Sequence, residues 1–381
     1  MTDASEQQWS RIAGWTHRIV DDEVLLCNAD RVIVSVTGGA TPVYAVLDAP
    51  ASMSEIGARI ATTWPDRPLG PAAVAEALEA LASHGAVGVV SPEPATATEP
   101  GPTTGVTTQG SVAPHRCWGL TDDGSVMEIV VAAHLADELS LRWPPVGLRQ
   151  VVEEPAAGTP TIGRLGLGEH RLFVPDDLSE LAHHPDEVAW GLLEQSLAAK
   201  AAEHLDHLVA VHSAVIAWEG AVILVPATSG AGKSSLALAA HEAGAAVLSD
   251  EYALIDPESG LVTGWNRPAR IRRPGSPGSS GKDRVDIAVD SPPLPVGLVA
   301  SLTYEPGAST DWTEMSSSES VLALLANTVV ARTRPDSSLD AALAVARSAD
   351  GVVGRRGEAG VSVARLLALV EDRLARGRPA P

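Results

Sequence analysis

Cysteine, aromatic side chains and positive charge are all scarce in this sequence of 381 residues. Its two cysteines, Cys27 and Cys117, are too few for a disulfide framework or a cysteine-based zinc site, which fits a reducing compartment. Lysine and arginine total 27 against 48 acidic residues, a formal net charge of -21. Nucleic acid binding depends on cationic side chains and stacking aromatics, and the aromatic fraction is only 3%. We therefore expect no nucleic acid partner.

Long apolar runs are also missing. No stretch reaches the roughly 18 consecutive apolar residues of a membrane-spanning helix. The first ten residues, MTDASEQQWS, are polar and lack the basic and then apolar pattern of a secretory signal. The hydrophobic fraction of 45% is nevertheless that of a folded protein. We expect a cytoplasmic protein with no membrane association.

One segment interrupts the chain. The sequence SPEPATATEPGPTTGVTTQGSVAP, residues 91–114, is rich in proline, threonine and glycine and contains no leucine or isoleucine. Such a composition cannot bury enough apolar surface to offset the entropy of ordering the chain. We predict an N-terminal domain at 1–90, a flexible linker at 91–116 and a C-terminal domain at 117–381, in a chain of mixed α+β and α/β class.

The N-terminal block is predicted to be a small winged helix-turn-helix. Strand-like runs at 15–20, 23–28 and 31–36 precede three helices. The second helix begins with a capping box from Ser52 to Glu55, and the third has Pro71 in its first turn and Gly85 as its stop. A returning strand, AVGVV, closes the block.

The charge of this block argues against the DNA binding that such a fold often serves. It holds eleven acidic residues against five arginines and no lysine, and the third helix carries Glu76 and Glu79 without any cation. A peptide added as a strand at the edge from Arg31 to Val36, next to the helix from Pro71 to His84, is the better use of such a surface. The alternative is a domain that only buttresses the rest.

The C-terminal block centres on a phosphate-binding loop. ATSGAGKS fits [AG]-x-x-x-x-G-K-[ST], with an apolar strand, AVILV, before it and a helix closed by Gly244 after it. Gly230 and Gly232 let backbone N–H groups face phosphate oxygens, Lys233 reaches the β and γ phosphates, and Ser234 ligates Mg²⁺. The candidate nucleotide-binding residues are Ala227, Thr228, Ser229, Gly230, Ala231, Gly232, Lys233, Ser234 and Ser235.

Residues on either side of the loop add to this site. The run SAVIAW-EG-AVILV predicts a tight hairpin before the loop, which gives the loop strand an antiparallel neighbour and indicates a branch distinct from common GTPases and ATPases. Asp250 and Glu251 close the apolar run after the helix, where a metal-binding or base carboxylate belongs. His212 opens the hairpin; taken alone it is a core or capping histidine.

Other expectations concern the remaining segments of this block. SVMEIVVAA and HRLFVP predict strands, and helices are expected at about 186–210, 317–327, 339–348 and 361–376. The run NRPARIRRPG concentrates Arg267, Arg270, Arg272 and Arg273 in an acidic protein. It either binds a phosphate or acidic substrate segment or forms a solvated loop.

Residues 212–255 resemble the core of the HPr serine kinase family and its relative PEP carboxykinase. The histidine, hairpin, loop, helix and acidic pair occur in that order and spacing. The resemblance implies that Lys233 and Ser234 bind ATP and Mg²⁺, that Asp250 takes the proton of a serine hydroxyl with His212 near it, and that Glu251 and Asp250 ligate the metal with Ser234. Because that family tends to form hexamers, it also implies a homo-oligomer.

This sequence lacks the arginine- and glycine-rich signature that bifunctional members carry after the acidic pair, so the resemblance does not extend to phosphorylase activity or to HPr as the substrate. The N-terminal block is similar to PqqD-type peptide-recognition domains through VYAVLDAPASMSEIGARI and the helix before GAVGVV. Such domains clamp the leader of a ribosomally made precursor peptide against an edge strand and the third helix.

Taken together, these features predict a kinase that uses ATP and Mg²⁺ to phosphorylate a serine or other hydroxyl of a precursor peptide. The tethered leader-binding domain raises the local concentration of the peptide. Two alternatives remain open. One is a small-molecule kinase, which would not need the N-terminal domain. The other is a chaperone in which ATP binding controls only the transfer of a bound peptide, without phosphorylation.

Overall fold

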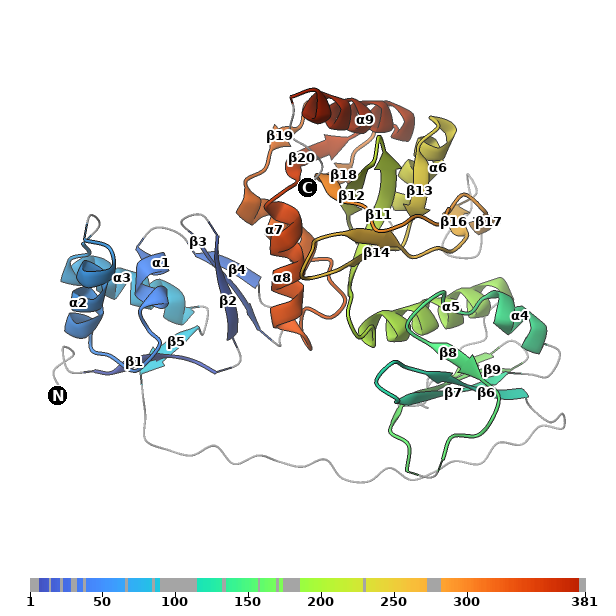
Figure 1. Ribbon diagram of the computed structural model, residues 1–381, viewed down its shortest axis with the longest axis horizontal. Coiled ribbons are helices and arrows are strands. Elements are labelled where there is room, and N and C mark those ends of the chain that lie inside the picture. Colours follow the sequence, from blue (N-terminus) through green and yellow to red (C-terminus); the bar gives the residue numbers. More distant parts are fainter. Residues whose placement is uncertain are drawn as a thin grey trace. The chain divides into compact units, whose positions relative to one another are not determined.

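The computed structural model describes residues 7–13, 15–20, 23–28, 33–36, 39–65, 68–83, 86–89, 115–131, 135–156, 158–168, 171–173, 186–228, 231–272 and 282–376. The chain divides into two compact units, Met1–Ser111 with Ala331–Asp336, and Val112–Val330 with Ser337–Pro381 (Figure 1). Both helices and mixed sheets are present, as expected for a mixed α and β class. No helix in the described ranges has the length and apolar character needed to span a membrane.

The described part of the first unit combines two small antiparallel sheets with three helices. Its elements are β1 (Trp9–Arg11), β2 (Trp15–Val20), β3 (Glu23–Asn28), β4 (Ile33–Val36), α1 (Ala40–Ala45), α2 (Met53–Thr63), α3 (Pro71–Ser83) and β5 (Val87–Val89). One sheet has the order β2-β3-β4, and the other pairs β1 with β5. The strands expected at 15–20 and 23–28 are confirmed. Arg31 and His84 lie outside the described residues.

Local sequence explains the second and third helices. Ser52 caps α2, accepting from the Glu55 N–H at 3.3 Å while the Glu55 carboxylate accepts from the Ser52 N–H at 2.7 Å. The predicted capping box is therefore confirmed. In α3 the predicted face of Val74, Leu78 and Leu81 is buried, packing with side chains of α1 and α2 in one core.

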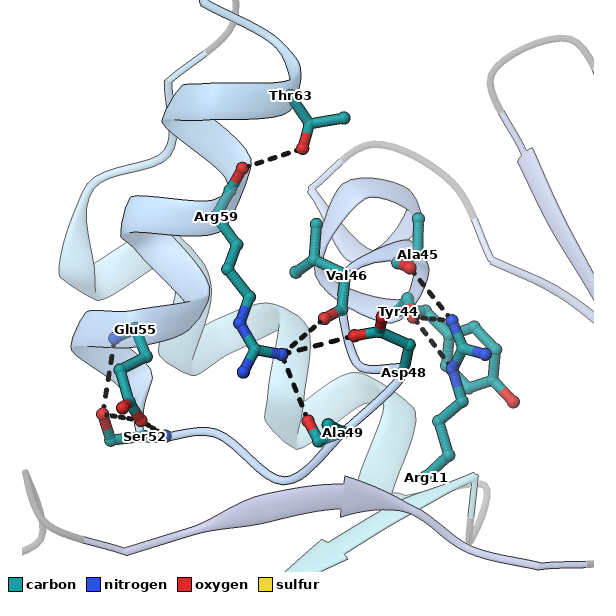
Figure 2. Close-up of polar contacts among 10 residues, drawn as sticks. All are labelled: Arg11, Tyr44, Ala45, Val46, Asp48, Ala49, Ser52, Glu55, Arg59 and Thr63. Atoms are coloured by element: carbon teal, nitrogen blue, oxygen red, sulfur yellow. Dashed lines mark hydrogen bonds and ion pairs between the residues drawn. The ribbon is translucent and has the colours of Figure 1, made fainter.

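Two arginines hold the end of α1 and the segment after it (Figure 2). Arg11 donates to the Tyr44 carbonyl at 2.8 Å and the Ala45 carbonyl at 3.0 Å, with its guanidinium 4.7 Å from the Tyr44 ring centre. Arg59 donates to the carbonyls of Val46 at 3.0 Å and Ala49 at 3.2 Å. The carbonyls at a helix end lack intrahelical donors, and these cations supply them. Two of the few cations in this unit thus serve its own backbone.

The second unit contains a five-stranded sheet covered by a long helix. The sheet has the order β10-β9-β7-β6-β8. Its strands are β6 (His115–Leu120), β7 (Val126–Val131), β8 (Arg149–Val151), β9 (Thr161–Gly168) and β10 (Arg171–Phe173), and its helices are α4 (Ala136–Leu141) and α5 (Asp186–Glu203). Leu193 and Leu197 of α5 share a core with Ile129 of β7 and Leu254 of the next sheet. Figure 1 shows α5, in green, along this sheet.

The larger sheet of this unit carries the loop motif. Its order is β15-β14-β11-β12-β18-β20-β19, with β13 also paired to β11. The strands are β11 (Val209–Trp218), β12 (Ala221–Pro226), β13 (Ala246–Ser249), β14 (Tyr252–Ile255), β15 (Val262–Gly264), β18 (Val296–Tyr304), β19 (Thr313–Glu314) and β20 (Asp350–Arg356). A separate ribbon pairs β16 (Ala269–Arg272) with β17 (Lys282–Val285). The helices are α6 (Lys233–Glu242), α7 (Ser317–Leu325), α8 (Pro335–Ala346) and α9 (Ala359–Ala375).

The hairpin expected before the loop is confirmed. β11 and β12 pair antiparallel from Ser213↔Pro226 to Trp218↔Ala221. Glu219 and Gly220 at the turn both have positive φ, 49° and 80°, which the favoured two-residue hairpin turn requires. On its other side β12 pairs in parallel with β18, and β18 in parallel with β20. The carboxyl ends of these three strands therefore meet at one edge of the sheet.

Two sequence expectations for this unit were wrong. The helix expected at about 186–210 ends at Glu203, because residues from Val209 onward pair with β12 and β14 instead. The strand β20 was not expected, since DGVVGRR has two glycines and no alternating pattern. It exists because β18 supplies a parallel partner along its whole length.

The capping box is expected to stabilise the first turn of α2. Replacing Ser52 by alanine removes the acceptor for the Glu55 N–H, which costs about 1 kcal/mol. Hydrogen exchange of the amides of α2, measured by mass spectrometry on the full chain, is expected to speed up about fivefold. Thr62→Ala, at an exposed position of the same helix, is the control and should leave exchange unchanged. Equal exchange in both variants would show that the cap contributes nothing.

Candidate active site

The loop expected to hold phosphates joins β12 to α6 at the edge where the parallel strands end. Gly232 caps α6 in the left-handed conformation, with φ of 86°, which a glycine adopts without strain. Leu236, Ala237 and Ala240 anchor α6 against the sheet and α9. The N–H groups of the first helical turn, which have no intrahelical acceptors, therefore lie at this edge. Ser229 and Gly230 lie outside the described residues.

The side chain of Lys233 is buried against the main chain of the loop. Its residue is 6% exposed, and its ammonium donates to the carbonyls of Ala227 at 2.7 Å and Thr228 at 2.9 Å. It also lies 3.4 Å from Nδ1 of His212. These two main-chain carbonyls hold the ammonium at the mouth of the loop, close to the N-terminus of α6. Ser235, also expected at this site, is exposed.

The structure brings His212 into this site from β11. Its backbone N–H donates to the Asn327 carbonyl at 2.8 Å, and its ring centre lies 5.6 Å from that of Tyr252. Burial, with the neighbouring Lys233 charge, lowers the pKa of His212 to about 4. The imidazole is therefore neutral near pH 7, and a neutral ring can accept a hydrogen bond where an imidazolium cannot.

Ser234 and Asp250 form the shortest described polar contact of the site, with the Ser234 hydroxyl donating to Oδ2 of Asp250 at 2.5 Å. Asp250 follows β13 directly, as expected, where the chain bends before β14. Ser249 holds this bend, because its hydroxyl accepts from the N–H of Glu251 at 3.0 Å and of Tyr252 at 3.1 Å. The antiparallel pairing of β13 with β11 brings the acidic pair to the edge where the loop begins.

Glu251 points towards a buried network of charges. Its carboxylate lies 3.9 Å from Arg267, whose other terminal nitrogen is 2.6 Å from Oε2 of Glu194. Glu194, buried on α5, also pairs with Arg142 at 2.8 Å. A solvated loop is therefore the wrong description of Arg267, whose side chain is only 10% exposed and pairs with Glu194. Arg270 and Arg272 lie in β16, and Arg273 lies outside the described residues.

Sequence reasoning missed Arg356, the last residue of β20. Its guanidinium donates to the carbonyls of Ala231 at 2.8 Å and Gly232 at 3.3 Å. A Cβ at position 232 would collide with Nη2 of Arg356, so glycine is needed there for this approach as well as for the turn. Glu194 and Arg142 were missed too. Of these three residues, only Arg356 lies in a distinctive stretch of sequence, the GRRG run at 354–357, and that run matches none of the motifs described above.

Among the described residues, no three His, Cys, Asp or Glu side chains are placed to hold a metal ion by themselves. Ser234 and Asp250 do bring two hard oxygen ligands together. Mg²⁺ in phosphate-transferring sites is commonly held by one or two protein oxygens and by the phosphates of the substrate. The donor set thus fits Mg²⁺ together with a nucleotide.

Comparisons with known proteins add little to this geometry. No model of a known protein family matches the chain, and no curated protein matches it. Among solved structures, the chain is similar to the HPr(Ser) kinase/phosphatase from Coxiella burnetii, with 14% identity and a TM-score of 0.28. That match covers 45% of this chain and 99% of the other. Because the TM-score is so low, the roles of the residues are taken from their own geometry.

The neutral His212 predicts a pH-dependent stability. Its pKa is about 4 in the folded protein and 6.5 when unfolded. Because the unfolded chain takes up this proton first, stability is complete above pH 6.5 and is lost as the pH falls towards 4. The free energy of unfolding in urea should drop by about 1.5 kcal/mol more between pH 7.5 and pH 5.5 in the wild type than in His212→Gln. His241→Gln, at an exposed position, is the control and should behave as the wild type.

A His212→Gln variant with the same pH dependence as the wild type would contradict this assignment. The wild type and His212→Gln share every other titrating group, so the difference between these two proteins isolates the imidazole of His212. The charged and titrating neighbours that face it are Lys233 and Tyr252.

Proposed function

We propose that this chain is a phosphotransferase that uses ATP and Mg²⁺ to phosphorylate a hydroxyl group. The observation that carries the proposal is the grouping of Lys233, Ser234 and Asp250 at the N-terminus of α6. A buried ammonium, a helix N-terminus and a serine–aspartate pair are the parts that position phosphates and balance their charge. Phosphoryl transfer needs mainly positioning and charge neutralisation, and these residues supply both.

Each side chain then has a part in the proposed reaction. Lys233 binds the terminal phosphates of ATP, and the Ser234 hydroxyl with Asp250 holds Mg²⁺, which neutralises phosphate charge when bound. Ser234 lies against Oδ2 of Asp250, so Oδ2 would be the oxygen that ligates Mg²⁺ with Ser234, and Oδ1 would take the proton of the acceptor hydroxyl. That hydroxyl oxygen forms a bond to the γ phosphorus as the bond from the γ phosphorus to ADP breaks. We assign Glu251, the other expected metal ligand, to hold the bend beside Asp250 through Arg267.

Binding and transfer should separate in two variants. Lys233→Ala removes a charged donor to phosphate and is expected to weaken ATP binding by about 10- to 100-fold. Asp250→Asn keeps the size of the side chain and the acceptor for Ser234 but loses the base, so phosphoryl transfer should fall about 100-fold or more while ATP still binds. Isothermal titration and radiolabel transfer from ATP measure the two effects.

The matched control is Lys200→Ala, because the Lys200 side chain on α5 is 39% exposed and its described side-chain contact is with Glu203. It should bind ATP as the wild type does. If Lys233→Ala binds ATP equally well, the loop is not a nucleotide site. If Asp250→Asn retains full transfer, another group is the base.

We infer further that the acceptor hydroxyl belongs to a ribosomally made precursor peptide recruited by the first unit. Within the described strands β4 pairs only with β3, so one of its edges is open to a peptide strand. Glu76 and Glu79 are exposed on α3, a surface that favours a peptide with basic residues. The proposed module is of the PqqD type, with a winged helix-turn-helix fold. A tethered module of this kind raises the local peptide concentration at the kinase site.

Intact-mass spectrometry tests the peptide assignment. A candidate precursor peptide incubated with the full chain, ATP and Mg²⁺ should gain one phosphate, and Lys233→Ala should abolish the gain. Removing the leader from the peptide should slow the reaction by lowering the effective concentration. A leaderless peptide phosphorylated as fast as the complete one would exclude recruitment by the leader. ATP bound without transfer to any peptide would favour the small-molecule kinase or the nucleotide-gated chaperone.

A further inference from the structure

Arg356 is buried at the edge of the sheet where the phosphate loop begins. It ends β20, and its residue is 2% exposed. Nη2 donates to the carbonyls of Ala231 and Gly232, Nη1 donates to the Gly357 carbonyl at 3.3 Å, and the guanidinium lies 5.1 Å from the centre of the Tyr304 ring. The side chain therefore contacts the loop directly, from a strand more than a hundred residues away in sequence.

The charge of Arg356 lacks the counter-charge that the other buried arginines have. Three arginines in the described ranges are buried: Arg142, Arg356 and Arg373. Arg142 pairs with Glu194 at 2.8 Å, and Arg373 pairs with Asp350 at 2.6 Å. No ion pair within 4 Å is described for Arg356, and the carboxylate that acts on it, the exposed Glu358, does so from farther away. Its Nε, like that of Arg373, has no hydrogen-bond partner among the described residues. Burial lowers the pKa of Arg356, and Tyr304 and Glu358 offset only part of this effect.

A buried cation without a close counter-charge is costly, and proteins retain one where a ligand or a partner supplies the opposite charge. Carbonyl oxygens and one aromatic ring offset only part of that cost. The loop that Arg356 contacts is the segment where the phosphates of ATP are proposed to bind. Gly232 leaves room for the guanidinium, because a side chain at that position would overlap it. The missing negative charge and the proposed anion site thus coincide.

We propose that Arg356 is a second cation of the phosphate site, which supplies fixed positive charge to the bound phosphates and holds the main chain of Ala231 and Gly232 in place. The proposal rests on the proposed nucleotide-binding function. Lys233 lies at the start of α6, directly after the loop, whereas Arg356 ends β20 and reaches the loop from the neighbouring parallel strands. One guanidinium nitrogen, Nη2, donates to both loop carbonyls, and the planar guanidinium fixes that nitrogen more rigidly than a lysine side chain fixes its ammonium.

Arg356→Gln isolates the charge, because glutamine keeps an N–H donor for the loop carbonyls but carries no cation. Titration calorimetry with ATP, tripolyphosphate and adenosine separates phosphate recognition from nucleoside recognition. The variant should bind ATP and tripolyphosphate about 10- to 100-fold more weakly than the wild type and adenosine equally well. Arg356→Lys should recover part of the loss. Arg355→Met is the matched control, since the Arg355 side chain is 72% exposed and pairs with Glu305, and it should bind all three as the wild type does.

Thermal unfolding without ligand distinguishes this role from a purely structural clamp. Removing an unpaired buried charge should leave the Tm of ligand-free Arg356→Gln equal to or above that of the wild type, while the rise in Tm on adding ATP becomes smaller. A lowered ligand-free Tm with unchanged phosphate affinity would overturn the proposal in favour of the clamp. If Arg356→Gln does not fold, Arg356→Lys provides the test. The proposal would also be overturned if Arg356→Lys bound ATP and tripolyphosphate as tightly as the wild type but had a lower ligand-free Tm.

The same titrations distinguish a wrong role for Arg356 from a wrong assignment of the nucleotide site. If the wild type binds neither ATP nor tripolyphosphate, the nucleotide site itself is wrong. If the wild type binds both and Arg356→Gln binds them equally well, the nucleotide site stands and the role of Arg356 is wrong.

Discussion

The pairing of β11 with its neighbours is the constraint on which the site depends. This strand forms a hairpin with β12 on one side and pairs with β13 and β14 on the other. The hairpin places the start of the loop beside His212, whose carbonyl accepts the Ala227 N–H at 3.2 Å. The second pairing brings Asp250 to the same edge. If β11 shifted by one residue, its side chains would exchange faces, and these groups would separate.

Buried charge is distributed unevenly around this edge. Glu194, Glu138 and Glu251 lie among three arginines, so negative and positive groups balance there. The three are Arg142, Arg267 and, 3.9 Å from Glu194, Arg284. At the loop, by contrast, Lys233 and Arg356 are held mainly by carbonyl oxygens and an aromatic ring. In a protein with a formal net charge of -21, two cations placed in this way put local positive charge at the loop, which favours the phosphates that the proposed function assigns to it.

The two units use their few cations differently. In the first, Arg11 and Arg59 are engaged with main-chain carbonyls at the end of α1, while the exposed face of α3 is acidic. In the second, cations gather at the loop. The acidic face of α3 is complementary to a basic peptide, and the cationic loop is complementary to nucleotide phosphates. The proposed function assigns these two ligands to these two surfaces.

Sequence by itself determined the local parts of this protein. Ser52 and Glu55 specified a cap, Glu219 and Gly220 a hairpin turn, and Gly232 with Lys233 a loop that opens a helix, because each depends on backbone conformation and contacts within a few residues. Tertiary structure alone decided the rest. β20 forms only because β18 is its partner. Arg356 meets the loop from more than a hundred residues away, and Glu194 meets Arg267 across more than seventy. No local pattern encodes such meetings, since they follow from which strands and helices pack together.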